Sequence, residues 1–270
     1  MLPTATLVPV DGYDASTYGD RFAEVYDDWY GDVTDVGAST ARLAALAAGG
    51  PVLELGVGSG RLAVPLAQLG VHVHGIDTSA AMVDRLRAKP GGDRVTVTIG
   101  DMSELALGDP PPFSVVFVAF NTLFNLATEA EQRRCLQRVG ELLAPGGVLV
   151  VEAFVPRDDI AAGAEASVAP RRITADEVVL TVSRVDQDAQ TITGQHIHLR
   201  EDGIRLRPWH LRYLSPGQLD GLAADAGLTL AARSAGWSDE PFTASSSVHV
   251  STYHRANVRA VPETPPAEPR

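Results

Sequence analysis

The stretch VLELGVGSG at residues 52–60 is an apolar run that passes into glycines at every second position. A buried strand that ends in Gly56, Gly58 and Gly60 forms a turn whose backbone can lie close to a ligand. Free N–H groups then follow at the start of the next helix. This chemistry indicates a cofactor site. The spacing differs from the G-x-G-x-x-G of dinucleotide-binding proteins, because the third glycine falls one residue early and Arg61 follows it.

Acidic residues close the next two apolar runs. Asp77 ends the run 71–77, about 20 residues beyond the glycines, where a carboxylate can accept hydrogen bonds from ribose hydroxyls. Asp101 follows the run 95–100 and could take an adenine amino group while Met102 lies on the ring. A helix cap or a turn explains either acid alone, since Asp favours both. Suitable groups at three adjacent strand ends make a cofactor site the better interpretation.

Alternating strands and helices would bring these groups together. Short β-rich apolar runs predict strands at 52–56, 71–77, 95–100, 113–120 and 148–154. Helical spacing of apolar residues predicts helices at 16–30, 39–48, 60–69, 79–89 and 129–143. Strands that alternate with helices form a mainly parallel sheet covered on both faces. We therefore predict a doubly wound α/β fold with ligands at the carboxyl ends of the strands.

The pattern changes after this region. Three β-patterned runs without intervening helices predict an antiparallel meander at 177–186, 191–200 and 204–214. Ser215 is a good N-cap, so a helix should follow it. The runs 228–236 and 247–254 would complete a seven-stranded sheet whose last strand is antiparallel. The tail 256–270, rich in Pro, Glu and Arg, is predicted to be disordered.

These motifs together resemble the class I S-adenosylmethionine-dependent methyltransferases over roughly residues 22–154. The segment 54–60 is similar to their first motif, GIDTSAAM at 75–82 to their acidic second-strand motif, and 100–102 to their adenine motif. The later landmarks lie at 113–120 and 143–147, and 22–27 is similar to the N-terminal lid of many small-molecule members. The antiparallel insert and the Ser215 helix resemble the amino-sugar N-methyltransferases of antibiotic biosynthesis.

The resemblance implies a single methyltransferase domain at 1–255, with an N-terminal helical lid at 16–48 and a β-meander insert at 157–214 over the active site. It implies that these residues bind S-adenosylmethionine: Tyr26, Glu54, Gly56, Gly58, Gly60, Asp77, Thr78, Met82, Asp101, Met102 and Phe120. Tyr26 and Tyr30 lie one helical turn apart and could close over a sulfonium, which an aromatic face favours. Packing of an amphipathic helix explains each of them equally well.

The acceptor side departs from the amino-sugar enzymes. A histidine commonly follows the fourth strand there, whereas this chain has Asn125, and an amide cannot serve as a general base. The catalytic candidates are therefore Tyr30, Glu152 and His210, and His196 and His198 are further candidate bases. We expect the acceptor to contact Asn121, Asn125, His196, His198 and Trp209.

His196 and His198 would share one strand face. A solvated histidine on a hairpin is commoner than a catalytic one, and no partner carboxylate has the spacing of a metal site, so no metal is expected. The insert could alternatively be a dimer surface anchored by Trp209 and Tyr213, so a homodimer is possible.

The composition of the chain excludes some classes of partner. The chain has 270 residues and a net charge of −12, which disfavours nucleic acid because such a chain repels phosphates. The single cysteine gives no sign of an oxidising compartment, and no apolar stretch approaches the ~20 residues of a membrane span. We therefore predict a cytoplasmic protein with no membrane partner.

The expected function is transfer of a methyl group from S-adenosylmethionine to a nitrogen or oxygen of a small molecule, such as a natural-product or amino-sugar intermediate. Such an enzyme works mainly by holding nucleophile, methyl carbon and sulfur in line. An NAD-dependent oxidoreductase would use the same sheet, but it should show G-x-G-x-x-G and usually a Tyr-Lys pair, and Lys89 is the only lysine. A cofactor-binding regulator without transfer activity is the other alternative.

Overall fold

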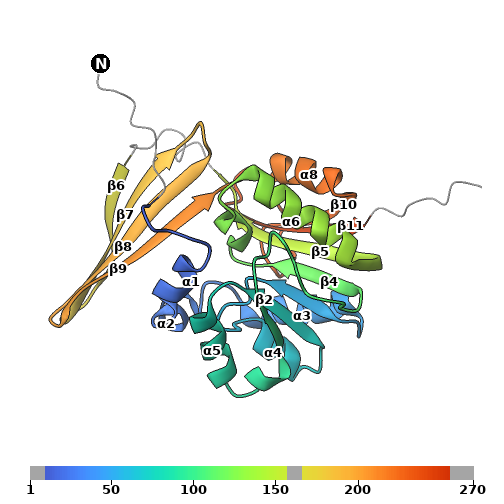
Figure 1. Ribbon diagram of the computed structural model, residues 1–270. Helices are drawn as coiled ribbons and strands as arrows, with labels where there is room; N and C mark the ends of the chain where they lie inside the picture. The colour runs from blue at the N-terminus through green and yellow to red at the C-terminus, as the bar shows by residue number, and fades with distance from the viewer. Residues whose placement is uncertain (1–9, 157–165, 256–270) are drawn as a thin grey trace, which may run out of the picture.

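The computed structural model describes residues 10–156 and 166–255 (Figure 1). Its centre is a seven-stranded sheet in the order β10-β11-β5-β4-β1-β2-β3. Strands β1 to β5 are parallel, whereas β11 is antiparallel to both of its neighbours, β5 and β10. The prediction of a mostly parallel seven-stranded sheet with an antiparallel last strand is therefore confirmed. The strands are β1 (Val52–Leu55), β2 (Val73–Asp77), β3 (Thr96–Ile99), β4 (Phe113–Val118), β5 (Leu143–Phe154), β10 (Leu228–Ser234) and β11 (Val248–Arg255).

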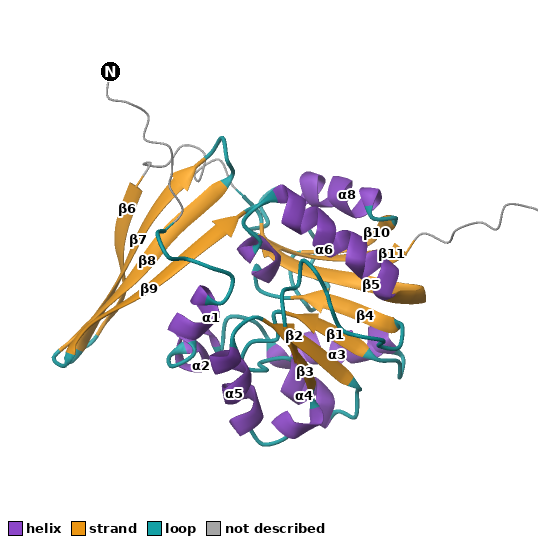
Figure 2. Cartoon of the chain, in the orientation of Figure 1, coloured by secondary structure: helices purple, strands orange, loops and turns teal. Residues whose placement is uncertain are grey.

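Helices cover both faces of this sheet (Figure 2). One face packs against α3 (Val36–Ala47), α4 (Ala63–Gln68) and α5 (Ala80–Ala88), and the other against α6 (Glu129–Leu142) and α8 (Pro216–Asp225). Strand β4 shows how one apolar run fills two cores. Val115 and Phe117 belong to the core under α3 and α4, whereas Val116 and Val118 belong to the core under α6 and α8.

The predicted helix at 16–30 is wrong in one respect, because the structure divides it into α1 (Thr17–Phe22) and α2 (Tyr26–Tyr30). The N–H of Val25 donates to the carbonyl of Phe22, which is a tighter turn than the α-helix allows. The resulting bend lets the rings of Phe22 and Tyr30 pack in one cluster with Met82. Burial of these rings outweighs helix continuity.

A second sheet, separate from the first, contains four antiparallel strands in the order β6-β7-β8-β9. The predicted meander accounts for β7 (Glu177–Asp186), β8 (Thr191–Arg200) and β9 (Gly203–Arg212), but β6 (Ala166–Ile173) was not predicted. Every residue of β6 is exposed, and Pro170 interrupts it, so the run has no hydrophobic alternation to detect. The predicted disordered tail at 256–270 and the first part of the insert, 157–165, lie outside the described residues.

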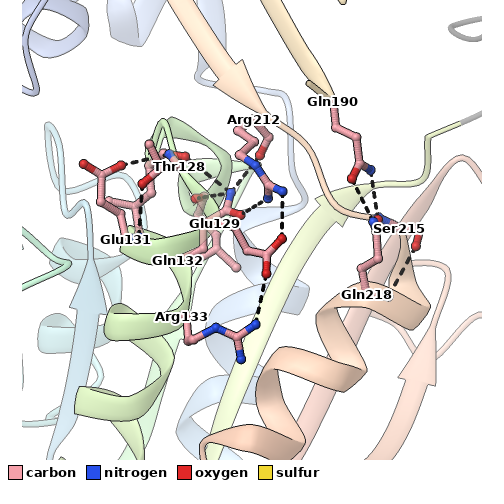
Figure 3. A network of polar contacts seen from close by, with 11 residues as sticks. Thr128, Glu129, Glu131, Gln132, Arg133, Gln190, Arg212, Ser215 and Gln218 are labelled. Carbon is pink, nitrogen blue, oxygen red and sulfur yellow. Dashed lines mark hydrogen bonds and ion pairs between the residues drawn. The ribbon is translucent and has the colours of Figure 1, made fainter. Parts of the chain in front are cut away.

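Polar contacts at the base of this second sheet fix it to the helices of the first (Figure 3). Arg212, at the end of β9, donates to Gln132 Oε1 over 2.7 Å and to Glu129 Oε2 over 3.0 Å, both on α6. Gln190 exchanges hydrogen bonds with Gln218 of α8. Both helices begin with a capping box, at Thr128 and Ser215, so these contacts lie on well-defined helix starts. Two short 3₁₀ helices complete the described structure: η1 (Gly92–Arg94) and η2 (Thr122–Asn125).

Candidate cofactor and acceptor site

A cavity of about 730 Å³, open to solvent, lies where β1, β2 and β3 end. The N-terminal residues from Tyr13 to Tyr26 cover it, and η2 closes one side. Its lining residues are Tyr13, Ala15, Tyr18, Gly19, Tyr26, Gly56, Gly58, Ile76, Asp77, Thr78, Met82, Gly100, Asp101, Met102, Thr122, Asn125 and Leu126. Three residues that the resemblance assigned to the cofactor do not line it: Glu54, Gly60 and Phe120.

Backbone conformation explains the three glycines after β1. The φ angles of Gly56, Gly58 and Gly60 are +67°, +53° and +77°. Residues that carry a Cβ rarely adopt such positive values, whereas glycine does so readily. A Cβ on Gly56 would lie 2.3 Å from Cγ2 of Thr122 on the opposite wall. A Cβ on Gly60 would instead meet Leu86 of α5, so Gly60 serves packing behind the cavity.

Asp77 supports the same turn from the end of β2. Its Oδ2 accepts the N–H of Gly58 over 2.8 Å, and its Oδ1 accepts the N–H of Ser79 over 2.8 Å. Burial raises the pKa of Asp77, and these backbone hydrogen bonds oppose the rise. A carboxylate has about four acceptor positions, so lone pairs are left for hydroxyl groups of a ligand.

The end of β3 supplies the far wall. Asp101 Oδ1 accepts the N–H of Ser103 over 2.7 Å, which orients the carboxylate beside Met102. Thr78 lies at the neighbouring strand end, and its hydroxyl donates to the carbonyl of Ala15 over 2.8 Å. Thr78 therefore attaches the N-terminal segment to the rim of the cavity.

Glu54 is buried beside the glycine turn, and the half-buried Arg61 interacts with it through charge. Burial raises the pKa of Glu54 to about 8, and Arg61 opposes that rise. Glu54 Oε2 and Arg61 Nη1 are both buried without a hydrogen-bond partner among the described residues. Unpaired buried polar atoms are costly, so this pair fits a ligand that brings a cationic and an anionic group together. The amino-acid end of S-adenosylmethionine is such a zwitterion. Neither side chain lines the cavity itself, but both adjoin in the chain the glycine turn that does, so the residues present fit this cofactor.

The role that this geometry gives Arg61 was not predicted from the sequence, where the residue stands out only as a departure from the dinucleotide pattern. The available signal was its place directly after the last glycine, opposite a glutamate at the end of a buried strand.

Lys89 attaches the N-terminal helices to the glycine turn. Its ammonium donates to Asp27 Oδ1 of α2 over 2.8 Å and to the hydroxyl of Ser59 over 3.1 Å. Ser59 in turn donates to the same Asp27 oxygen over 2.6 Å. Three segments of the chain therefore meet at one lysine beside the first cavity.

A second cavity adjoins the first and shares four of its walls, Tyr18, Tyr26, Thr122 and Asn125. Its other lining residues come from α2, the turn after β4 and the second sheet: Tyr30, Phe120, Asn121, Arg171, Thr181, His196, Trp209 and Leu211. Four residues predicted to contact the acceptor lie here: Asn121, Asn125, His196 and Trp209. No carboxylate is among these described lining residues, and Arg171 is their one permanent charge.

His196 is the histidine that reaches this second cavity. Its Nδ1 lies 2.9 Å from the hydroxyl of Thr181, and rings of Trp29 and Trp209 pack around it. Burial lowers the pKa of His196 to about 4, and Arg171 adds to the effect. The imidazole is therefore neutral at neutral pH.

The structure does not support the predicted roles of His198 and His210. His198 shares the face of His196, as predicted, but its Nε2 contacts Glu177 Oε2 at 2.7 Å and its Nδ1 contacts Arg207 Nη1 at 3.2 Å. Both ring nitrogens are thus occupied, outside the lining of the two cavities. His210 points to the opposite face, where its Nδ1 lies 2.8 Å from the hydroxyl of Thr193.

The contacts of Glu152 also differ from those expected of a catalytic base. Its Oε2 accepts the N–H of Phe120 over 2.8 Å, and its Oε1 accepts the hydroxyl of Thr34 over 3.4 Å. Neither cavity is lined by Glu152. The carboxylate instead stabilises the turn after β4, where Phe120 and Asn121 both have positive φ, +46° and +64°. Asn121 Oδ1 adds a bond from the N–H of Phe154 over 2.7 Å.

Aromatic rings line the region where the two cavities meet. The rings of Tyr26 and Tyr30 lie 5.1 Å apart, and Tyr30 lies 5.7 Å from Phe120. Burial raises the pKa of Tyr26 to about 12 and also raises that of Tyr30, so both phenols keep their protons at neutral pH. Tyr30 therefore offers a hydroxyl and a ring face to the second cavity, but no proton acceptor of phenolate type.

Within residues 10–156 and 166–255, no cluster of three or more His, Cys, Asp or Glu side chains is arranged to bind a metal ion. The helices in those ranges are also too short or too polar to cross a membrane.

Comparison with known proteins agrees with this geometry. The family model described as a methyltransferase domain matches residues 52–147, which span the glycine turn and the strand ends. The solved structure of the CcbJ methyltransferase from Streptomyces caelestis is 43% identical, with a TM-score of 0.81. That alignment covers 90% of this chain and 100% of CcbJ. A fold of this class with this site defines a cofactor-dependent transferase, and the chain belongs to the S-adenosylmethionine-dependent methyltransferases.

More distant similarities extend this assignment. CalS10, an amino pentose methyltransferase of calicheamicin biosynthesis from Micromonospora echinaspora, was solved with S-adenosylmethionine bound. It is 24% identical with a TM-score of 0.64, over 86% of this chain and 97% of CalS10, and shows a shared fold. The predicted resemblance to small-molecule methyltransferases of antibiotic biosynthesis, and the predicted cofactor, are confirmed. The alternative of an NAD-dependent oxidoreductase is wrong.

Two curated relatives show how far the sequence similarity reaches. An uncharacterized methyltransferase of Geobacillus kaustophilus is 34% identical over 139 residues, 52% of this chain. This chain spans only 63% of that relative's length. The cypemycin N-terminal methyltransferase of a Streptomyces species is 29% identical over 201 residues, 73% of this chain and 80% of the relative.

Proposed function

We propose that this protein transfers a methyl group from S-adenosylmethionine to an amine nitrogen of a small natural-product intermediate. The observation that carries the proposal is the second cavity. It adjoins the cofactor cavity, and its described lining contains no carboxylate and no group able to deprotonate a hydroxyl at neutral pH. An acceptor that reacts here must bring its own free lone pair.

Residues at the ends of three neighbouring strands would each hold a different part of the cofactor. Glu54 and Arg61 would hold its amino-acid end, Asp77 its ribose, and Asp101 with Met102 its adenine. When bound, S-adenosylmethionine supplies a methyl group on a positively charged sulfur, an electrophile that needs no further activation. Tyr26 lines both cavities and Phe120 lines the second, and their rings would limit water near the transferred methyl group.

An amine suits this cavity better than a hydroxyl. A neutral amine has a lone pair before reaction and can release its proton after methyl transfer, so it needs no strong base in the site. A hydroxyl would need a base, and the imidazole of His196 is too weakly basic with a pKa of about 4. The guanidinium of Arg171 also disfavours a protonated amine, because like charges repel.

His196 would position the acceptor. Its neutral imidazole, oriented by Thr181, can exchange a hydrogen bond with an N–H or O–H of the acceptor, while Trp209 offers a flat apolar wall. The amide of Asn125 lines both cavities and can contact either ligand. We also propose that residues 16–48 act as the lid and that the insert, described from residue 166, covers the acceptor.

The activities named for two similar proteins support nitrogen as the methylated atom. One is an N-terminal methyltransferase and the other acts on an amino pentose. Natural-product amines, amino sugars included, are therefore the first acceptors to test.

The test is methyl transfer itself. Purified protein is incubated with S-adenosylmethionine and a library of amines and matched hydroxyl compounds, and products are identified by mass spectrometry and NMR. We expect N-methylated products from amines, at rates that rise with pH as the free acceptor loses its proton. Methylation of hydroxyl compounds alone would contradict the proposal. Cofactor binding with no transfer to any acceptor would favour the regulator alternative.

A further inference from the structure

The second sheet has an apolar face turned away from both cavities. Direct pairing across its four strands aligns side chains in rows, and opposite residues in an antiparallel pair lie on the same face. Three successive rows make up what we call the outer face: Ile173, Val178, Leu199 and Ile204; Pro170, Leu180, Ile197 and Leu206; Val168, Val182, Gln195 and Pro208. Gln195 is the one polar residue among these twelve positions.

The opposite face of the same strands has a different character. Its rows contain His196, His198, Arg207 and Trp209, which contact the N-terminal helices or line the second cavity. One sheet therefore has a polar, aromatic side toward the site and an apolar side away from it. Strand alternation alone separates the two.

Most of the outer face is left uncovered by the described chain. None of its twelve residues belongs to the three hydrophobic clusters of the described structure. Val168, Ile173, Ile204 and Leu206 are between 51% and 69% exposed, and they are half of the large apolar residues found exposed. The described N-terminal segment reaches the β9 side of the third row, where Val10 to Tyr13 share a hollow with Gln195 and Pro208, and Pro208 is buried. Ile204 and Leu206 in the first two rows stay exposed. An apolar face of this kind is typical of an interaction surface.

The size of the face suits a protein partner. Four strands about 4.8 Å apart and three rows about 7 Å apart cover roughly 400 Å² in plan. The accessible area of the side chains is larger, so two such faces approach the ~1,200 Å² of the smaller stable complexes. Two sheets can pack face to face about 10 Å apart, as they do in sandwiches.

The charges beside the outer face do not oppose a second copy of this chain. The rim at the tip carries both signs in pairs, Arg172 with Glu177 at 2.8 Å and Arg205 with Asp202 at 3.2 Å. Two copies therefore meet without local repulsion. A net charge of −12 disfavours an anionic membrane surface. An uncharged apolar face is also complementary to itself, as a two-fold interface requires.

We propose that the protein is a homodimer in which the outer faces of two copies pack against each other. The proposal does not depend on the acceptor's identity. It replaces the predicted anchors, because Trp209 lines the second cavity and Tyr213 is buried in the core. The insert then has two functions, one on each face.

The test is the mass in solution of the full chain, measured by sedimentation equilibrium across micromolar concentrations. We expect twice the chain mass. The double variant Ile173→Asp, Leu206→Asp places charge near opposite edges of the face, and it should raise the dimer dissociation constant at least ~100-fold. Both side chains are more than half exposed in the single chain, so the variant should keep its fold. Cofactor affinity, measured by calorimetry, verifies this.

The matched control is Leu69→Asp, Ile99→Asp, because these side chains are exposed to a similar degree but lie on the cofactor side of the molecule. This control should remain dimeric. A monomeric wild type, or a face variant that dimerises as tightly as wild type, overturns the proposal. A variant that lacks residues 2–9 tests whether this segment, and not a second copy of the chain, covers the outer face. If the wild type is a monomer and the deleted chain associates, this segment covers the face and not a second copy.

Discussion

Asp77 has two partners before any ligand arrives, because its oxygens accept the N–H groups of Gly58 and Ser79. Its remaining lone pairs face the cavity. We expect Asp77→Ala to weaken S-adenosylmethionine binding at least tenfold, since hydrogen bonds to a charged group contribute about 1.5 to 3 kcal/mol. Calorimetry measures the change, and Asp84→Ala, an exposed acid on α5, is the control. Unchanged affinity in Asp77→Ala would remove this carboxylate from the site.

Glu54 makes cofactor affinity depend on pH. In the free protein its pKa is raised to about 8, so the group is largely protonated at neutral pH. A bound ammonium group would favour the ionised form, so binding releases a proton there. Affinity should therefore rise as pH increases from about 6 to 8 and become constant above, by up to tenfold per pH unit.

Calorimetry in buffers of different ionisation enthalpy measures the released proton. Glu54→Gln cannot ionise and should bind with little pH dependence over this range. A wild type whose affinity falls with rising pH would show that Glu54 does not face the ammonium group.

At the scale of elements, the glycine turn between β1 and α4 determines access to the cofactor cavity. Gly58 has a φ of +53°, and a Cβ there would contact only the carbonyl oxygen of Gly56, at 3.9 Å. Strain and lost cavity volume therefore act together in Gly58→Val. We expect this variant to lose cofactor binding. Gly70→Val tests strain alone, because Gly70 also has positive φ and open space but lies far from the cavity. Normal methylation by Gly58→Val would mean that the first motif was misinterpreted.

The turn after β4 gives an element-scale test of Glu152. Two successive residues with positive φ cost about 1 to 3 kcal/mol each unless neighbouring groups stabilise them. Glu152→Ala removes the acceptor for the Phe120 N–H and should lower both the melting temperature and turnover. Glu152→Gln keeps a carbonyl oxygen and should restore most of both. A general base would behave otherwise, because glutamine could not restore turnover.

The sequence contained enough to predict the elements of the main sheet, since buried parallel strands are continuous apolar runs between helices with recognisable caps. Strand β6 could not be predicted, because it is exposed on both faces and its pattern reflects no core. The histidines show how far the site could be predicted from the sequence alone. Periodicity placed His196 and His198 on one face, but only the three-dimensional contacts of Glu177 and Arg207 show that His198 is unavailable to a ligand.

At the scale of the whole molecule, the two cavities draw their walls from different parts of the chain. The cofactor cavity depends on the parallel sheet and the N-terminal segment, and the acceptor cavity also on the insert. His196→Ala should therefore raise the acceptor KM about tenfold and leave the cofactor Kd unchanged. Glu201→Ala, at the exposed turn between β8 and β9, should leave both constants unchanged. Equal effects of the two substitutions would mean that the insert contributes stability only.

Lys89 gives the molecule a built-in reporter. It is the only lysine in the chain, and its ammonium lies between Asp27 of the N-terminal helices and Ser59 of the glycine turn. Amine-directed labelling can therefore modify one internal site, whose reactivity depends on whether those helices are seated. An isotopic tag on that side chain would report whether the N-terminal helices contact the glycine turn, once the signal of the chain's terminal amine is subtracted.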